Sequence, residues 1–461
     1  MRSYGLSKSK IIAGLQCVKR LWLTVHRPDL AQATAETERL WASGHRVGEV
    51  ARSLYPGGVL IEAFSDLRHA KAETRAALAI PGDKVLFEPA FDCGGVLVRA
   101  DLVFAGPGGN RLVEVKASTA VKDYHLSDAA VQAWVITNSG LVLDSVAVAH
   151  IDNQFVYQGD GDYRGLFSEV DVSARIQPLM QQVPMWITDF RRALACPLPA
   201  ITVGPQCHSP FDCTFLEHCT PPDEGTLPAE PARLDPASRA MVFDLGYPRA
   251  YLDFEAIAFA VPIWAGTRPY EQLPFQWSLH VERAGGTLDH AEFLHTTGEP
   301  PMRAVAESLI AALGDGGMAG PTAPVLAYGS YERGILEGLA RRFPDLSPAL
   351  LSISQRLVDL LACTRRWYWH PDLHGSWSLK AVLPTVAPDL DYAALAEVQD
   401  GGAAQQAYLR LIGGDAGDAH GAAPMPLTEE RREALRQALL AYCAQDTLGL
   451  VRLVRFFADG M

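Results

Sequence analysis

The chain has 461 residues, of which 48% are hydrophobic and 20% charged, and its formal net charge is -13 at pH 7. This length exceeds one ordinary domain core and predicts about two domains. No apolar run reaches the roughly 18 residues of a membrane span, and the N-terminus lacks the apolar segment of a secretory signal, so we expect a cytoplasmic protein. The acidity excludes coating of nucleic acid by bulk attraction, although it is compatible with acidic metal sites.

Residues 1–30 form a basic segment, with six lysines and arginines against the single acid Asp29. This excess suits a surface that faces phosphates, with Lys19 and Arg20 as candidate nucleic-acid contacts. An ordinary solvated terminus is the alternative.

Helical periodicity follows around 34–54, and a second helix is expected near 126–137. Strands are expected between them, near 84–91, 96–104 and 110–118. The first half therefore predicts a mixed α/β domain.

Two apolar runs, VLVRADLVF and RLVEVKAS, flank the turn sequence AGPGGN and should pair as an antiparallel hairpin. If the hairpin is symmetric about Pro107 and Gly108, the numbers of facing residues sum to 215, and Asp101 lies opposite Glu114. Facing carboxylates, with Cβ atoms about 4.5–5.5 Å apart, repel unless a cation lies between them. Lys116 projects from the same face as Glu114. The hairpin thus predicts two acids and one ammonium around a divalent metal.

This constellation resembles the PD-(D/E)XK nuclease superfamily, with Asp101 as the first acid and EVK, residues 114–116, as the E-x-K element. The resemblance implies Mg²⁺ or Mn²⁺ on the two carboxylates and a lysine, Lys116, that positions hydroxide or stabilises phosphorane charge. It also implies His45, on an upstream helix, as a metal ligand of RecB-like type, and Gln132 as a counterpart of the RecB-like glutamine motif. A solvated hairpin face and a structural histidine are the alternatives.

A group of cysteines lies at the two ends of this half: Cys17, Cys207, Cys213 and Cys219. Their distribution resembles the iron-sulfur RecB-like exonucleases of CRISPR adaptation and the AddB nuclease domain, which implies a 4Fe-4S cluster on four thiolates. The interval from Cys207 to Cys213 is longer than the usual C-x-x-C. Zinc, with His208 or His218 in place of one cysteine, is the runner-up, and buried free cysteines are the third possibility.

A proline-rich stretch, residues 220–238, reads as a linker because it cannot hold a regular helix or a central strand. We expect a nuclease-like domain over 1–219, a linker over 220–246 and a second domain over 247–461. A loose segment at 413–426 is expected to be a surface loop.

The second half opens with PRAYLDFEAIAF, an apolar strand on which Asp253 and Glu255 share one face. Glu332 follows in VLAYGSYERGIL, at a strand, turn and helix start. The chain ends in a long helix, with Thr428 as its N-cap, that carries Tyr442 and Asp446 four residues apart on one face. Clustered acids suit two Mg²⁺ ions, which hold the attacking and leaving oxygens of a phosphodiester in line. A polar strand edge and an ordinary helix face are the alternatives for the separate motifs.

The order of these motifs resembles the DnaQ-like 3′-5′ exonucleases of the ribonuclease H fold, in the form with a Y-x-x-x-D third motif. This resemblance implies Asp253, Glu255, Glu332 and Asp446 as metal ligands and Tyr442 as the residue that orients the attacking water. Glu332 is a departure, because an aspartate is usual there and a longer carboxylate shifts the geometry.

The stretch TRRWYWHPDLHGSWSLK, residues 364–380, interleaves cations with aromatic residues. Such a stretch suits single-stranded nucleic acid, because bases stack on aromatic faces, at about 1–3 kcal/mol per base, while cations bind phosphates. Trp377 and Lys380 are the candidate contacts, and packed core aromatics are the alternative. Asp359, just upstream, is either a helper acid or a structural residue.

Taken together, the elements resemble a bacterial family in which an iron-sulfur RecB-like nuclease is fused to a DnaQ-like exonuclease domain. The expected fold class is α/β, with a restriction-endonuclease-like N-terminal domain and a ribonuclease H-like C-terminal domain. We expect a metal-dependent nuclease that acts on DNA, at single-stranded ends, in repair, recombination or defence. A nucleic-acid-binding scaffold with inactive sites and an RNA-processing exonuclease are the alternatives.

Overall fold

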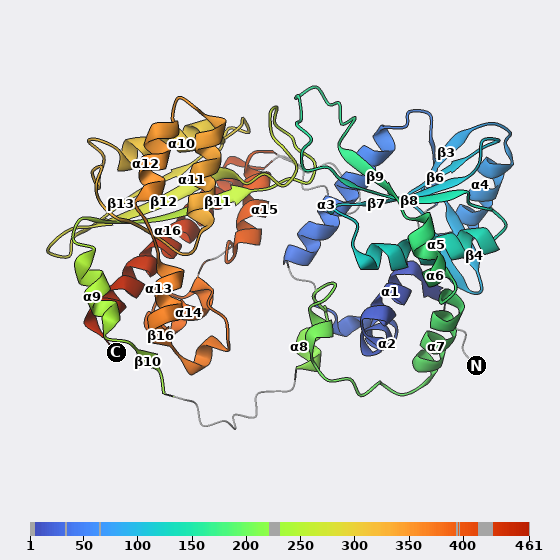
Figure 1. Cartoon of the computed structure of the whole chain (residues 1–461), viewed down its shortest axis with the longest axis horizontal. Helices are drawn as coiled ribbons and strands as arrows, with labels where there is room; N and C mark the ends of the chain where they lie inside the picture. The colour runs from blue at the N-terminus through green and yellow to red at the C-terminus, as the bar shows by residue number, and fades with distance from the viewer. Residues whose placement is uncertain are drawn as a thin grey trace. The chain divides into compact units, whose positions relative to one another are not determined.

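The computed structural model divides the chain into two compact units (Figure 1). The first consists of Met1–Glu224 and Phe259–Pro269, and the second of Gly225–Ala258 and Tyr270–Met461. The expected division did not foresee that Phe259–Pro269 groups with the first unit. The described residues are 5–32, 35–63, 66–220, 231–392, 395, 397–413 and 427–460, with the backbone alone described for 35–39.

A six-stranded mixed sheet lies at the centre of the first unit, in the order β2-β3-β6-β7-β8-β9. Its strands are β2 (Val59–Leu60), β3 (Lys84–Phe87), β6 (Leu102–Ala105), β7 (Arg111–Lys116), β8 (Ser145–Ile151) and β9 (Phe167–Asp171). A smaller sheet contains β1 (Leu6–Ser7), β5 (Val96–Arg99) and β4 (Ala90–Cys93).

Helices precede, separate and follow these strands. They are α1 (Lys8–Gln16), α2 (Val18–His26), η1 (Pro28–Leu30), α3 (Ala35–Ser53), α4 (Leu67–Ala79), α5 (Asp123–Asn138), α6 (Ser173–Met180), α7 (Val183–Ala195), η2 (Pro205–Cys207) and α8 (Leu216–Cys219). The alternation of helices and strands confirms the mixed α/β class.

Helix α5 is buried on nearly all sides, as expected for a helix that is apolar around its circumference. Three alanines, Ala129, Ala130 and Ala133, lie in the core with Val131, Val135 and Ile136. The polar residues Asp128 and Gln132 of the same helix are therefore carried into the interior of the unit, where they are 6% and 0% exposed.

The predicted hairpin register is confirmed. Leu102 pairs with Val113 and Phe104 with Arg111, so the numbers of facing residues do sum to 215. The run expected as one strand over 96–104 is interrupted, however, because β5 pairs with β4 and β1 while β6 pairs with β3 and β7. Asp101 lies at this interruption, where its Oδ2 accepts a hydrogen bond from the backbone N–H of Val115 at 2.7 Å.

A five-stranded sheet forms the centre of the second unit, in the order β13-β12-β11-β14-β15. Its strands are β11 (Arg249–Ile257), β12 (Leu273–Glu282), β13 (Leu288–Leu294), β14 (Val325–Ala327) and β15 (Leu357–Asp359). β11, β12 and β13 are antiparallel, whereas β14 and β15 run parallel to β11. A separate pair joins β10 (Arg233–Leu234) to β16 (Tyr368–Trp369).

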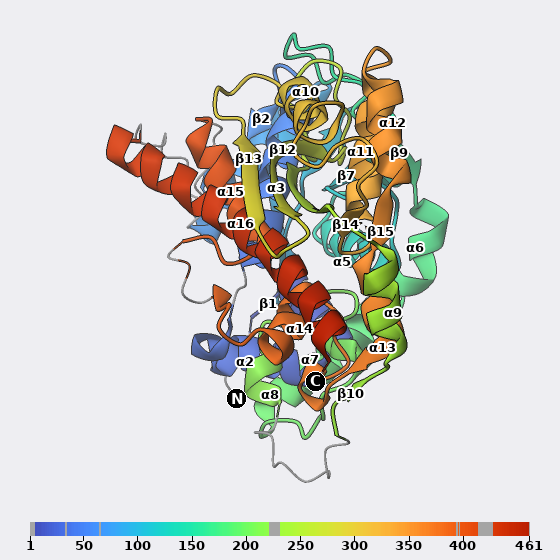
Figure 2. The ribbon, with the colours of Figure 1, turned by 90° about the vertical axis from the view of Figure 1, so that its left-hand side faces the viewer.

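The second unit also contains helices, and several of them contact the sheet. They are α9 (Ala237–Asp244), α10 (Met302–Leu313), α11 (Tyr331–Arg342), α12 (Ser347–Gln355), α13 (Leu360–Trp367), η3 (Pro371–Leu373), α14 (Leu379–Val386), α15 (Gly401–Leu411) and α16 (Glu429–Asp459). Figure 2 shows α16 crossing the sheet obliquely, and α16 packs against β11, β12 and β13. The predicted N-cap of α16 is confirmed, because the Thr428 side chain accepts a hydrogen bond from the N–H of Arg431.

The segment expected to be a linker, 220–246, is partly regular structure. Residues 221–230 lie outside the described residues, but β10 and α9 follow, and Val242 of α9 belongs to the core of the second unit. Proline does not prevent this helix, since Pro236 is its N-cap, before the backbone needs intrahelical donors. The expected loop at 413–426 lies outside the described residues except for Gly413. In the described part of the chain, no helix has the length and apolarity that crossing a membrane requires.

Gly449 of α16 provides a test of this packing. A Cβ at this position would lie 2.4 Å from Leu383 Cδ1 of α14, and Leu383 is fully buried. We expect Gly449→Ala to destabilise the second unit by about 1–3 kcal/mol, because overpacking outweighs the gain in helix propensity. The measurement is chemical denaturation of the full chain.

Gly334 of α11 is the matched control. It is exposed, and a Cβ there would meet nothing within 4 Å. Gly334→Ala should therefore stabilise the unit by roughly 0.5–1 kcal/mol. Equal effects of the two substitutions would contradict the close approach of α14 to α16.

Candidate functional site

Charged and polar residues from α1, β7, α5 and the break between β5 and β6 meet inside the first unit and form what we call the lysine-acid cluster. Its members are Lys8, Asp101, Glu114, Lys116, Asp128 and Gln132. Glu114 is fully buried, and its Oε1 lies 2.9 Å from Lys8 Nζ and 2.6 Å from Lys116 Nζ. Its Oε2 accepts a hydrogen bond from Gln132 Nε2 at 2.6 Å. This contact agrees with the predicted supporting role of Gln132. Lys116 also lies 2.5 Å from Asp128 Oδ2.

Burial and neighbouring charge separate the pKa values of the two hairpin acids. Burial and the nearby Glu114 raise the pKa of Asp101 to about 8. The pKa of Glu114 is instead well below its usual range, because Lys116 and Lys8 outweigh the effect of its burial. Asp101 and Glu114 are neighbouring carboxylates, and Asp101 resists ionisation. A divalent cation bound to both would therefore be favourable.

His45 lies in α3, and its side chain is exposed. Among the described residues, His45 does not join Asp101 and Glu114 in a group whose ligand atoms all lie within 4.8 Å of one another. Its role as a metal ligand therefore stays a prediction, because the structure does not place it in one compact group of ligand atoms with the two hairpin acids.

The second unit contains an acidic cluster, which consists of Asp253, Glu255, Glu332 and Asp446. Ligand oxygens of Asp253, Glu255 and Asp446 all lie within 4.8 Å of one another. Asp253 and Glu255 come from β11, Glu332 from the first turn of α11, and Asp446 from α16. The structure thus brings three of the four predicted acids, Asp253, Glu255 and Asp446, together as one group. Glu332 lies beside them, since its charge raises the pKa values of Asp253 and Glu255.

Polar residues of β12 hold α16 against this face of the sheet. Gln276 pairs with Glu255 in the ladder, and its Nε2 donates to the carbonyl of Leu439 at 2.8 Å. Ser278, opposite Asp253, lies 2.8 Å from the Thr447 hydroxyl. Since side chains of facing residues leave the sheet on one side, these contacts bring α16, and with it Asp446, over the two acids of β11.

Burial raises the pKa values of all four acids in the acidic cluster, and repulsion by neighbouring acids adds to this for Asp253, Glu255 and Glu332. The pKa of Glu255 rises to about 8, that of Glu332 to about 7 and that of Asp446 to about 6, mainly through burial. Burial and the three neighbouring acids raise the pKa of Asp253 well above its usual range. Glu332 Oε2 is buried without a hydrogen-bond partner, and none of the four acids forms an ion pair with a described residue. Such a set of uncompensated oxygens fits a bound divalent cation.

Three further side chains border the acidic cluster. The hydroxyl of Tyr392 donates to Asp446 Oδ1, and Tyr442 is buried beside it. Lys380 Nζ lies 5.1 Å from the ring centre of Tyr442 and 5.4 Å from that of Tyr392, and its charge lowers the pKa values of Glu255 and Asp446. Lys380, predicted as a nucleic-acid contact, is therefore near the acids.

Two other residues of this stretch have structural contacts. Trp377 is partly buried against the core of the second unit, and its carbonyl accepts a hydrogen bond from Tyr328. This position favours the core alternative for its ring, and a stacking role stays a prediction. Asp359 is the N-cap of α13, where its Oδ1 accepts from the N–H groups of Leu361 and Ala362, so it serves a structural role.

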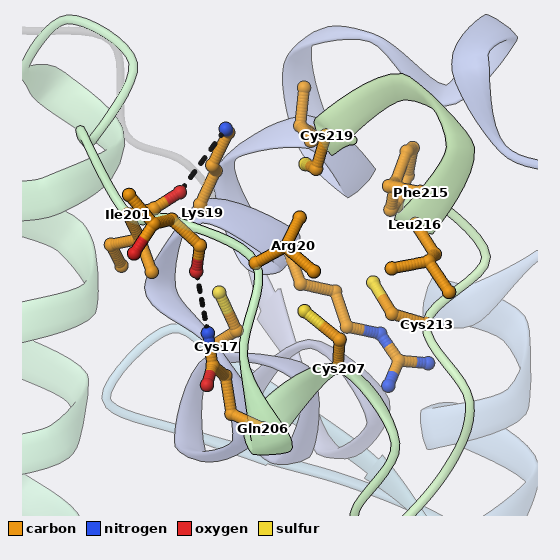
Figure 3. A pocket seen from close by; sticks show the side chains of 13 residues that line it. Cys17, Lys19, Arg20, Ile201, Gln206, Cys207, Cys213, Phe215, Leu216 and Cys219 are labelled. Carbon is orange, nitrogen blue, oxygen red and sulfur yellow. Dashed lines mark hydrogen bonds between the residues drawn. The ribbon is translucent and has the colours of Figure 1, made fainter. Parts of the chain in front are cut away.

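The four predicted cluster cysteines line a single pocket in the first unit, although they come from two distant segments of the chain, Cys17 and residues 207–219. Figure 3 shows Cys17, Cys207, Cys213 and Cys219 around this space. All four are free thiols. Neither His208 nor His218 lines the pocket, and His208 instead lies 2.9 Å from Asp212. The geometry therefore does not favour zinc with a histidine ligand.

Lys19 and Arg20, predicted as nucleic-acid contacts, also line this pocket. Lys19 Nζ donates to the carbonyl of Ile201 at 3.3 Å, and Arg20 donates to the side chain of Gln16. Arg20 lowers the pKa of the Cys213 thiol, although burial raises it overall. Two cations beside four thiols suit an anionic metal-thiolate centre, and a role in binding nucleic acid stays a prediction.

Helix α1 connects the pocket to the lysine-acid cluster. It begins with Lys8 and has Cys17 as its C-cap residue. The pocket segment also touches α5, because Phe211 packs against Tyr124 with ring centres 4.6 Å apart. The two features are thus parts of one structure.

Comparisons with known proteins give one family match, which lies mostly in the second unit. Residues 250–378 match the model of a domain of unknown function, DUF2779. None of the curated proteins matches the chain. Among the solved structures to which the chain is similar is the crystal structure of SSO0001, at 12% identity and a TM-score of 0.21, over 44% of this chain and 90% of that one.

The sequence did not indicate Asp128 or Tyr392 as members of a site, and it offered Lys8 only as part of a basic segment. Asp128 is four residues from Gln132 on α5, so its place on the same face was a signal that could have been used. Lys8 and Tyr392 had no local signal, because they reach their acids only through the tertiary fold.

The raised pKa values of the acidic cluster predict how stability depends on pH. Without metal, the folded state binds more protons than the unfolded state between about pH 4 and 8, so the second unit should lose stability as pH rises through 6 to 8. Mn²⁺ should raise the midpoint of thermal unfolding more at pH 8 than at pH 6, because protons compete with it at lower pH. The measurement is thermal unfolding in EDTA and in Mn²⁺ at both pH values.

Asp446→Asn provides the control, because it removes a ligand with little change in shape. This variant should lose most of the Mn²⁺ effect at pH 8. A metal effect that is the same in both proteins would place the cation elsewhere.

Proposed function

We propose that this protein is a metal-dependent nuclease that hydrolyses phosphodiester bonds of DNA at single-stranded ends. The observation that carries this proposal is the acidic cluster, in which carboxylates from a central strand and two helices converge without an ion pair to any described residue. Mg²⁺ or Mn²⁺ fits such oxygen ligands. The strand order of the second unit and the order of its motifs support a DnaQ-like domain of the ribonuclease H type.

In this proposal Asp253, Glu255 and Asp446 hold the metal, and Glu332 contributes its unpartnered oxygen. Bound metal supplies an activated water and stabilises the charge of the reacting phosphate. Tyr442, whose phenol is kept protonated by burial and by the neighbouring carboxylates, donates a hydrogen bond that orients the attacking water. Tyr392 holds Asp446 in place through its hydroxyl.

The lysine-acid cluster is a second candidate active site, of the RecB-like PD-(D/E)XK type. The specific observation in its favour is the position of Lys116 between two buried carboxylates, where its charge also acts on Asp101, an acid whose pKa burial raises to about 8. Asp101 and Glu114 would hold the metal there, and Lys116 would stabilise the negative charge that develops on the phosphate. Gln132 keeps Glu114 oriented.

For the cysteine pocket we propose a 4Fe-4S cluster. Four free thiols around one enclosed space, with two basic side chains, fit an anionic cluster, whereas the expected histidine ligands for zinc lie outside. The cluster would join the start of the chain to residues 207–219 and so stabilise the first unit.

The two candidate active sites predict separable activities. Asp253→Ala should abolish mononucleotide release from 3′ ends, because it removes a metal ligand, while Lys116→Ala should spare it. Loss of one such group typically lowers the rate by about 10²–10³. The double variant should be inactive. The measurement is degradation of end-labelled single- and double-stranded DNA in Mg²⁺ or Mn²⁺.

Asp244→Ala, at the exposed end of α9, is the control and should behave as the unaltered protein. Unchanged 3′ trimming in Asp253→Ala would show that the second unit is a binding platform. Faster degradation of RNA than of DNA would favour an RNA-processing exonuclease.

The cysteine pocket predicts a coloured protein. Protein purified without oxygen should be brown, and Cys213→Ala should lose iron and destabilise the first unit. Iron content and visible absorbance measure this, with Cys363→Ala, in the second unit, as the control. Stoichiometric zinc without iron would contradict the assignment.

A further inference from the structure

Lys8 brings a second ammonium group to the lysine-acid cluster. Its Nζ lies 2.9 Å from Glu114 Oε1 and 3.6 Å from Asp128 Oδ1. Lys116 already contacts both acids at 2.6 and 2.5 Å, and Gln132 donates to the other oxygen of Glu114. Each oxygen of Glu114 therefore has a donor without Lys8. The ammonium of Lys8 is therefore not needed to give the buried Glu114 carboxylate its hydrogen-bond donors.

The local sequence around Lys8 does not favour a cation there. Lys8 is the first residue of α1, directly after the N-cap Ser7, and the first turn contains no acid. A helix N-terminus carries a partial positive charge, so a lysine at this position is unfavourable for the helix itself. Departures of this kind from local preference are expected at functional positions.

The charges of the cluster show what Lys8 changes. Three carboxylates, Asp101, Glu114 and Asp128, face two ammonium groups. With a divalent cation on Asp101 and Glu114, the ionised cluster has one net positive charge, whereas without Lys8 it would have none. The side chain of Lys8 is also 24% exposed, while that of Glu114 is fully buried, so Lys8 is the partner of this pair that reaches solvent.

We propose that Lys8 binds a phosphate group of the nucleic-acid strand at the lysine-acid cluster. This inference rests on the proposed nuclease function of the first unit. If Asp101 and Glu114 held a divalent cation, the ammonium of Lys8 would be repelled from Glu114 and would donate to the phosphodiester anion of the substrate instead. Lys116 remains between Glu114 and Asp128, beside the reacting bond. Lys8 thus contributes to substrate affinity more than to the chemical step.

The experiment compares Lys8→Met with Lys10→Met in the full chain. Lys10 lies on the same helix, but its Nζ donates to the carbonyl of Gly5 and not to the cluster. Binding of a labelled single-stranded oligonucleotide is measured by fluorescence anisotropy in Ca²⁺ over a range of salt concentrations. Lys8→Met should reduce the slope of log affinity against log salt by about 0.7, the value for one phosphate contact. Lys10→Met should leave the slope unchanged, and Lys8→Arg should restore it.

A kinetic measurement separates substrate binding from a structural role. In Mn²⁺ and in the Asp253→Asn background, Lys8→Met should raise KM with little change in kcat, whereas Lys116→Ala should lower kcat. An unchanged slope together with a lower midpoint of thermal unfolding in Lys8→Met would make Lys8 a structural counter-ion and overturn the inference. If the unaltered protein does not bind the oligonucleotide, the proposed function fails too. Normal binding by that protein and by Lys8→Met would overturn the role of Lys8 alone.

Discussion

Burial of carboxylates is the constraint on which the two candidate sites depend. A carboxylate removed from water must be compensated by a cation or by hydrogen bonds, or else it binds a proton. The first unit compensates Glu114 from within, through Lys8, Lys116 and Gln132. The second unit leaves its four acids without an ion pair among the described residues, and their pKa values rise accordingly. The first unit thus compensates its buried carboxylate with its own side chains, while the oxygens of the second unit suit a divalent cation as ligands.

The scaffolds that impose this burial differ as well. In the first unit, helix α5 is buried on nearly all sides and carries Asp128 and Gln132 into the core. In the second unit, β11 is central and covered, and polar partners on β12 hold α16 above it. Polar residues so placed lose their freedom to rotate, because each has a defined partner. A site built in this way keeps its geometry before any ligand arrives.

Features with a local period could be predicted from the sequence. The hairpin register followed from a symmetric turn and the two-residue alternation of strands, and the N-cap of α16 followed from Thr428 and the acids after it. Pairings across long distances could not be predicted in this way. Lys8 lies 106 positions from Glu114, and Tyr392 lies 54 positions from Asp446, so neither pair leaves a periodic trace. The break at Asp101 was also missed, because both strands that flank it are apolar and nothing marks their separation into two sheets.

The course of α1 has a practical consequence for anyone who handles this protein. The helix has nine residues, about 13 Å at 1.5 Å per residue, and it places Lys8 at one end and Cys17 at the other. Oxidation of the Cys17 thiol in air would change the contacts at the C-terminal end of the same short helix that positions Lys8. Samples prepared aerobically can therefore differ in the lysine-acid cluster even when every residue of that cluster is chemically intact. If the proposed 4Fe-4S cluster is present, the colour of a preparation would measure how much of its first unit is intact.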